Sequence, residues 1–179
     1  NSVHEAHDFR YLDGFIAELD GMLREEPSFP SAEIELQATM SLFSALALRQ
    51  PQHPDIDCWE ERAFRLMRTV PDRNFRIHCC LYLAVYHLWS GNTARASLVV
   101  DLVREDASSR EVAPLALLSA KATIALYEWM TGDCERAINT VANALALADA
   151  NGIHLWDMHL LGHSAAAALS LVRILMTSA

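Results

Sequence analysis

Residues 84–96 read Ala84-Val-Tyr-His-Leu-Trp-Ser-Gly-Asn-Thr-Ala-Arg-Ala96, and the pattern returns 41 positions later as Ala125-Leu-Tyr-Glu-Trp-Met-Thr-Gly-Asp-Cys-Glu-Arg-Ala137. In each copy an apolar helical segment ends at a glycine, a polar residue follows, and a second helix begins with a small residue at its contact point. This is the pattern of two antiparallel helices joined by a tight turn. Its recurrence at a fixed spacing predicts a stacked array of helical hairpins.

The rest of the chain has the same character, because its hydrophobic spacing is helical throughout and no segment alternates like a strand. We expect an all-α fold, a right-handed superhelix of stacked antiparallel hairpins that forms one repeat domain over residues 1–179. Its eight expected helices cover residues 8–24, 32–49, 57–69, 72–90, 93–105, 109–131, 134–150 and 155–171 or beyond. The second pairs with the third, the fourth with the fifth and the sixth with the seventh.

Several helix ends follow from local chemistry. Ser31 is expected to cap the second helix, and Asp57-Cys-Trp-Glu60 has the form of a capping box that opens the third. Pro114 is tolerated only in the first turn of the sixth helix, and Gly152 closes the seventh. The first and last helices have no hairpin partner. Because the array begins and ends in mid-hairpin and lacks an initiator Met, we expect a fragment of a longer multidomain protein.

The amino-acid composition limits the classes of function that this chain can have. Hydrophobic residues make up 52% of the 179 residues and the mean hydropathy is +0.11, so either the core is large or apolar surface awaits a partner. No apolar run has the length of a membrane helix. The net charge of −9 disfavours direct binding of nucleic acid by this segment. The four cysteines form no C-x-x-C pair, which is ordinary for a reducing cytoplasm.

The hairpins resemble tetratricopeptide repeats, with Gly-Asp at the turn and Ala near the start of the second helix. They depart from that family in spacing, which is 33 and then 41 residues, and in having Cys80 and Lys121 at the early aromatic position. The longer period, with segments such as Ala125-Leu-Tyr-Glu-Trp-Met-Thr-Gly-Asp133 and Leu145-Ala-Leu-Ala-Asp-Ala-Asn-Gly-Ile-His-Leu-Trp156, is more similar to the repeats of MalT-like bacterial transcriptional regulators.

That resemblance implies a ligand-sensing or protein-docking array with a nucleotide-binding switch module before it and a DNA-binding or activator domain after it. This chain has no G-x-x-x-x-G-K-[ST] motif and no recognisable DNA-reading helix, so neither activity would reside here. The resemblance also implies that the first helix of each hairpin lines a concave groove. Counting from the turn glycines assigns to the groove His78, Leu81, Val85, Leu88, Trp89, Ser119, Ala122, Leu126, Trp129, Met130, Leu160 and His163.

Such a groove suits an amphipathic helix of a partner protein or a largely apolar small effector. The alternative is that the eighth helix, or a second copy of the chain, fills it. Homodimerisation through the groove or an end helix is a further expectation. The charge clusters Glu60-Glu61-Arg62 and Arg104-Glu105-Asp106 are interpreted as solvated helix ends.

Catalytic patterns are weak. Gly162-His-Ser164 imitates the start of a nucleophile elbow, but the closing glycine is replaced by Ala166 and the surroundings are helical. His159 and His163 stand at i, i+4, a spacing that can hold a metal, but without the Glu of H-E-x-x-H or an obvious third ligand.

We expect no enzyme, no cofactor and no metal. The predicted function is a cytoplasmic, non-catalytic binding or sensor module of a bacterial transcriptional regulator. The alternatives are a general protein–protein scaffold or a metal-dependent hydrolase built on His154, Asp157, His159 and His163.

Overall fold

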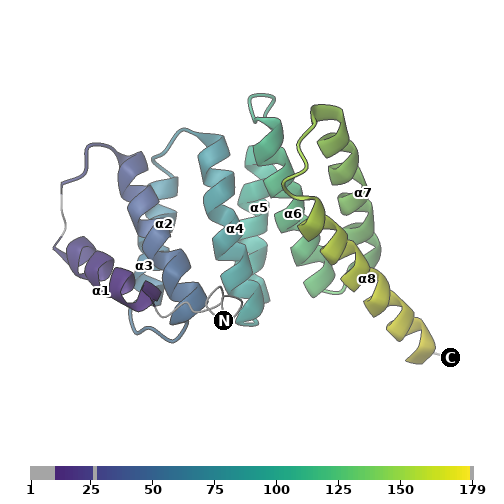
Figure 1. Cartoon of the computed structure of the whole chain (residues 1–179), viewed down its shortest axis with the longest axis horizontal. Coiled ribbons are helices and arrows are strands. Elements are labelled where there is room, and N and C mark those ends of the chain that lie inside the picture. The colour runs from purple at the N-terminus through teal and green to yellow at the C-terminus, as the bar shows by residue number, and fades with distance from the viewer. Residues whose placement is uncertain (1–10, 26–27, 178–179) are drawn as a thin grey trace, which may run out of the picture. The chain divides into compact units, whose positions relative to one another are not determined.

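The computed structural model describes residues 11–25 and 28–177, and within these residues it contains helices and no strand (Figure 1). This confirms the all-α prediction. The eight helices are α1 Tyr11–Arg24, α2 Ala32–Arg49, α3 Ile56–Met67, α4 Arg73–Trp89, α5 Thr93–Ala107, α6 Pro114–Met130, α7 Cys134–Asn151 and α8 Asp157–Thr177. The predicted first turn of α1, residues 8–10, and the two termini lie outside the described residues.

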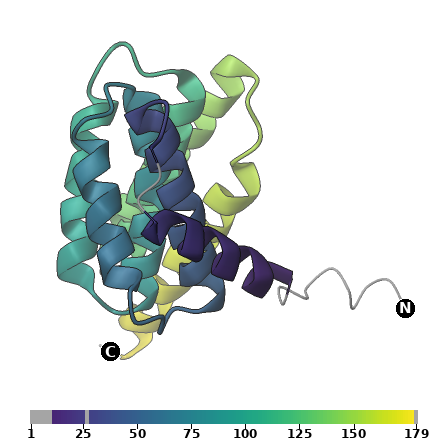
Figure 2. The same cartoon turned by 90° about the vertical axis from the view of Figure 1, so that its left-hand side faces the viewer.

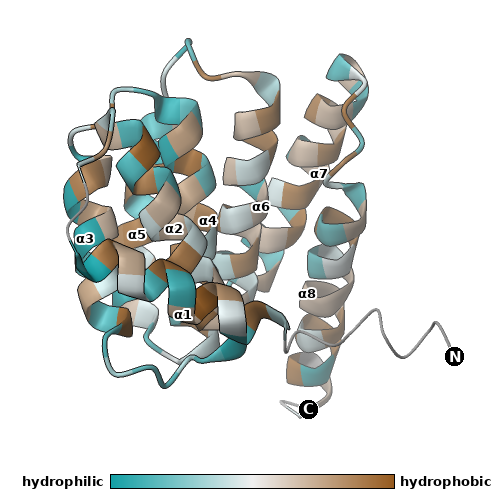
Figure 3. Cartoon of the chain, turned by 60° about the vertical axis from the view of Figure 1, so that its left-hand side comes forward, coloured by the Kyte–Doolittle hydropathy of each residue, from teal (hydrophilic) through white to brown (hydrophobic). Residues whose placement is uncertain are grey.

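The helices pack as sequential hairpins, α2 with α3, α4 with α5 and α6 with α7, as predicted. Their contacts gather into two compact units, residues 1–71 with α1–α3 and residues 72–179 with α4–α8. In the second unit α4 and α5 both contact α6, and α8 packs on α6 and α7. The superhelical path and the single repeat domain over the whole chain stay predictions. Brown apolar residues recur along the helices with teal polar residues between them (Figure 3), as expected of helices with one buried side.

The two copies of the repeated stretch form equivalent corners. Gly91 and Gly132 have φ angles of 77° and 93°, in the left-handed region that glycine adopts without steric cost. After each glycine an acceptor side chain caps the next helix: Asn92 accepts from the Arg95 amide and Asp133 from the Arg136 amide. The seventh helix ends as predicted at a left-handed Gly152, with φ 63°. Residues 152–156 then loop from α7 to α8 (Figure 1; Figure 2).

Two helix starts were predicted wrongly. The third helix begins at Ile56, so Asp57 lies inside it, and its N-cap residue makes no side-chain cap bond. The expected capping box is therefore absent. The sixth helix begins at Pro114 rather than at residue 109 or 110. If the helix began earlier, the ring of Pro114 would clash with a carbonyl of the preceding turn. At the first helical position a backbone N–H has no helical hydrogen bond to make, so proline is tolerated there.

Polar contacts of Arg62 link all three helices of the first unit. Arg62 of α3 donates to the Glu35 carboxylate of α2 at 2.7 Å and to the Leu23 carbonyl of α1 at 3.1 Å. Ser31 caps α2 as predicted, since its hydroxyl accepts from the Ile34 amide at 3.3 Å. Fully buried large side chains in this unit include Leu23, Leu36, Leu42, Phe43 and Leu46.

Among residues 11–25 and 28–177, no helix combines the length and hydropathy that crossing a bilayer requires. All four cysteines are free thiols. Burial raises the pKa of Cys79 and of Cys80 to about 12, so both stay protonated and act as small core residues.

Candidate functional site

The predicted groove residues divide by exposure, and five of them are not surface residues at all. Packing between helices explains this: Leu88 of α4 and Leu126 of α6 pack with Ala96 of α5. Ala122 of α6 packs with Leu160 of α8. On α6 the eighth helix thus covers Ala122, and the alternative that it fills the whole groove stays a prediction. The groove positions that must be corrected to core positions are Leu88, Ser119, Ala122, Leu126 and Leu160, each 7% exposed or less.

The α4 part of the groove remains at the surface. His78, Tyr82, Val85 and Trp89 follow one another at spacings of four, three and four residues, so they form one stripe along α4. We call these four residues the α4 stripe. Trp89 is 66% exposed and Tyr82 is 38% exposed, while Val85 is half-buried. The His78 and Tyr82 rings meet edge to face with centroids 5.6 Å apart.

Tyr82 was missing from the predicted groove, although it stands four residues after His78, which is a visible signal. Leu81, which was predicted, lies half-buried beside the stripe. Met130, at the position of α6 equivalent to Trp89, is 38% exposed. Whether these residues bind a ligand stays a prediction.

Trp129 and His163 form a joint between α6 and α8. Their rings stack with centroids 6.2 Å apart and planes 28° from parallel, and the Trp129 indole N–H donates to the Ser170 hydroxyl at 3.3 Å. The two side chains are partly buried. Burial, and then the nearby His159, lower the pKa of His163 below its ordinary 6.5. These two groove candidates thus hold helices together.

We expect this joint to weaken in acid. Because the pKa of His163 is lower in the folded chain than in the unfolded one, the unfolded chain binds the proton more readily. The stabilisation is complete above pH 6.5 and is lost as the pH falls through the folded pKa. Urea unfolding followed by helical circular dichroism between about pH 7.5 and 5.5 should show a smaller pH dependence for His163→Phe, which keeps a stacked ring, than for the wild type. His78→Phe, at an exposed position, is the control. Equal slopes for His163→Phe and the wild type would contradict the prediction.

The residues proposed for a metal site do not assemble. His154 pairs with Asp157 at 2.9 Å, whereas His159 packs edge-on against Trp156 at 5.4 Å and His163 stacks on Trp129. In the part of the chain that the structure describes, no three His, Cys, Asp or Glu side chains are arranged to hold a metal ion. Ser164 lies inside α8, so the strained strand-to-helix turn of a nucleophile elbow is missing.

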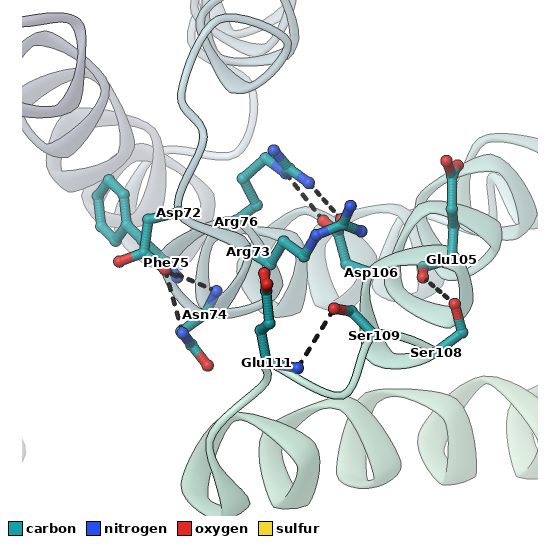
Figure 4. Close-up of polar contacts among 10 residues, drawn as sticks. All are labelled: Asp72, Arg73, Asn74, Phe75, Arg76, Glu105, Asp106, Ser108, Ser109 and Glu111. Atoms are coloured by element: carbon teal, nitrogen blue, oxygen red, sulfur yellow. Dashed lines mark hydrogen bonds and ion pairs between the residues drawn. The ribbon is translucent and has the colours of Figure 1, made fainter.

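Both charge clusters hold a buried residue that was interpreted as solvated. Asp106, only 7% exposed, accepts from Arg76 Nε at 2.9 Å and also from Arg76 Nη2, and Arg73 Nη1 lies 3.4 Å away (Figure 4). This pairing raises the pKa of Arg76. Glu60 of the other cluster is 1% exposed. The sequence held one signal: Arg73 and Arg76 stand at the start of a helix, where the dipole disfavours cations unless a carboxylate compensates them.

A second buried carboxylate joins α5, α6 and α7. Glu128 is 4% exposed and accepts from the Thr140 hydroxyl at 2.7 Å. Arg136 and Arg104 approach the other Glu128 oxygen at 3.4 and 3.7 Å. The repeat-equivalent residue in α4, His87, is also buried. The α4–α5 and α6–α7 hairpins therefore both bury a polar side chain at this position, where Glu128 links α6 to α5 and α7.

No family model, no curated protein and no solved structure matches this chain.

Proposed function

We propose that this chain is a non-catalytic helical-repeat module that binds an amphipathic helix of a partner protein on the α4 stripe. One observation carries the proposal: three of the four stripe residues are exposed on α4, whereas on α6 only Met130, the equivalent of Trp89, is exposed. The residues of α6 equivalent to His78, Tyr82 and Val85 are Ser119, Thr123 and Leu126, and all three are buried by protein. Within the second unit, the same surface of the repeat thus packs against protein on α6, while on α4 it presents exposed aromatic side chains.

The dimensions and composition of the stripe favour a helix over a small ligand. Eleven residues of helix separate His78 from Trp89, so the stripe is about 16 Å long. A partner helix could place three turns along it, with apolar residues at i, i+3 or i+4 and i+7. Aromatic side chains such as Trp89 and Tyr82 contribute most of the binding energy in many interfaces.

The wider setting that we propose is a cytoplasmic, MalT-like bacterial transcriptional regulator in which the hairpins continue as a right-handed superhelix. The repeated hairpin sequence and the sequential hairpin packing support this setting. In such an array each repeat contacts only its neighbours. Binding of a partner to one stripe would therefore change the angle between adjacent hairpins, and that change would be transmitted along the array to the flanking domains. A general scaffold without a regulatory role is the rival, and the identity of the partner distinguishes the two.

Site-specific photo-crosslinking in cells tests the binding surface. A benzoylphenylalanine at position 82 should give adducts with one protein, and Trp89→Ala in the same chain should reduce them at least about tenfold, since loss of an aromatic anchor costs about 2 kcal/mol or more. The same probe at Leu98, an apolar residue of α5 that is 63% exposed, is the matched control. Adducts that are equal at positions 82 and 98, or that are insensitive to Trp89→Ala, would refute the proposal. Competition by a small molecule would assign the stripe to an effector instead.

A further inference from the structure

The last helix, α8, is apolar on two opposite sides. One side is buried: Leu160 and Ala167 are fully covered by α6 and α7. The opposite side carries Met158, Leu161, Ala165, Leu169, Val172 and Met176, which we call the outer face of α8. Their spacings of 3, 4, 4, 3 and 4 residues average 3.6, the α-helical period. Leu169 is 72% exposed and Met158 is 82% exposed. An exposed row of large apolar side chains of this kind marks an interaction surface.

The repeat register shows what covers this face elsewhere in the molecule. Steps of 41 residues relate Leu161 to Ala120 and Cys79, and Leu169 to Glu128 and His87. All four equivalents in α4 and α6 are at most 4% exposed. On α6 the covering element is the antiparallel helix α7, whose Thr140 bonds to Glu128. At the positions of Leu161 and Leu169, the outer face of α8 is thus the face that receives an antiparallel helix in the α4–α5 and α6–α7 hairpins, whereas the equivalents of Val172 and Met176 are exposed there.

Residues 173 and 174 lack the tight turn that ends the first helix of the α4–α5 and α6–α7 hairpins. The turn glycine and the capping residue of the two hairpins, Gly91-Asn92 and Gly132-Asp133, correspond to Arg173-Ile174. Neither residue favours a left-handed turn or a helix cap, and α8 continues through this point to Thr177. Its last turns extend past α6 and α7 (Figure 1).

The apolar residues of the outer face of α8 are arranged symmetrically about its centre, so two copies of the face are complementary. Ala165 lies at its centre, with Leu161 and Leu169 four residues to either side and Met158 and Val172 seven residues to either side. The two charged residues of the helix, Asp157 and Arg173, lie eight residues from that centre. An antiparallel pair would therefore bring acidic and basic ends together, whereas a parallel pair would bring like charges together. A two-fold axis across a helix produces this antiparallel pair.

We propose that the outer face of α8 binds the same face of a second copy of this chain, with the two α8 helices antiparallel and crossing near Ala165. The pairing uses a different helix from the α4 stripe and does not depend on the proposed function. It gives each α8 the antiparallel neighbour that α4 and α6 already have.

Sedimentation equilibrium from about 1 to 200 μM tests the pairing, a range that brackets micromolar association. The 179-residue chain should reach twice its 19.9 kDa mass. Leu169→Glu places a charge in the apolar contact on both copies and should weaken dimerisation at least about a hundredfold, with unchanged circular dichroism because the position is exposed. Leu98→Glu, a matched change on α5, should leave the dimer intact. A wild-type chain that stays monomeric throughout, or a dimer that Leu169→Glu does not affect, would overturn the proposal.

Cysteine crosslinking tests the orientation. In a Cys58→Ser background, which removes the exposed thiol, Ala165→Cys should form a disulfide between copies because position 165 lies on the two-fold axis. Met176→Cys should not, since eleven residues along each of two antiparallel helices separate the two thiols by about 30 Å. Efficient crosslinking at both positions would mean a parallel pair, and none at either position would mean that α8 is not the contact.

Discussion

Replacing Leu160 with alanine is expected to lower the free energy of unfolding by about 2–5 kcal/mol. Leu160 is fully buried and packs in one cluster with Leu118, Ala122 and Ala125 of α6 and Val141 of α7. Truncation would remove its apolar contacts and leave a cavity among three helices that can close only in part. The measurement is urea unfolding followed by helical circular dichroism at one protein concentration.

Leu98→Ala is the matched control, because the same atoms are removed from a side chain that is 63% exposed. We expect its effect to stay within about 0.5 kcal/mol. Equal losses for the two variants would show that Leu160 faces solvent, as a groove residue would, and that α8 does not pack on α6 in the way described.

Replacing Asp106 with alanine is expected to cost about 2 kcal/mol, the second-largest loss. The change leaves the partly buried Arg76 guanidinium without its carboxylate, and breaking a buried ion pair from one side costs about 3–5 kcal/mol. We expect less than that range because the Arg76 side chain is 21% exposed and that of Arg73 is 41% exposed, so water compensates part of the loss.

The control is Asp101→Ala, which removes a carboxylate of the same helix whose side chain is 63% exposed and pairs with Arg104 at 3.1 Å. Its loss should lie below about 0.5 kcal/mol and shrink in 1 M salt, where surface charges are screened. The loss for Asp106→Ala should change little with salt. Similar small losses in the free energy of unfolding for both variants would show that Asp106 is solvent-exposed, as the sequence analysis expected.

Most helix ends were predicted from residues that lie within about one turn of them. The hairpin corners were predictable because a left-handed glycine followed by a capping Asn or Asp depends on neighbours within one turn, and the structure has both corners as expected. The start of α6 was missed for a reason that is also local, since Pro114 outweighs the polar turn before it. The pairing of helices followed from the short connections, which leave little choice other than antiparallel neighbours.

Residue roles at the surface were harder to predict. The groove was assigned from the positions of turn glycines, yet Ala122 is covered by α8 and Leu126 by α4 and α5. Nothing within α6 marks which of its sides another helix occupies. Buried charges show the same limit: Asp106 and Glu128 look like ordinary surface acids in the sequence, and they are buried because Arg76, Arg136 and Thr140 reach them from other helices.

Periodicity and turn chemistry were therefore sufficient to predict an all-helical chain of consecutive hairpins with equivalent corners at Gly91 and Gly132. Both effects act over a few neighbouring residues, so a single sequence is enough to predict them. Which apolar faces are covered, which carboxylates are buried and which stripe stays open depend on contacts between different helices, such as Arg76 with Asp106 and Trp129 with Ser170. Burial is a property of the packed helices together, so it emerged only when they were placed against one another.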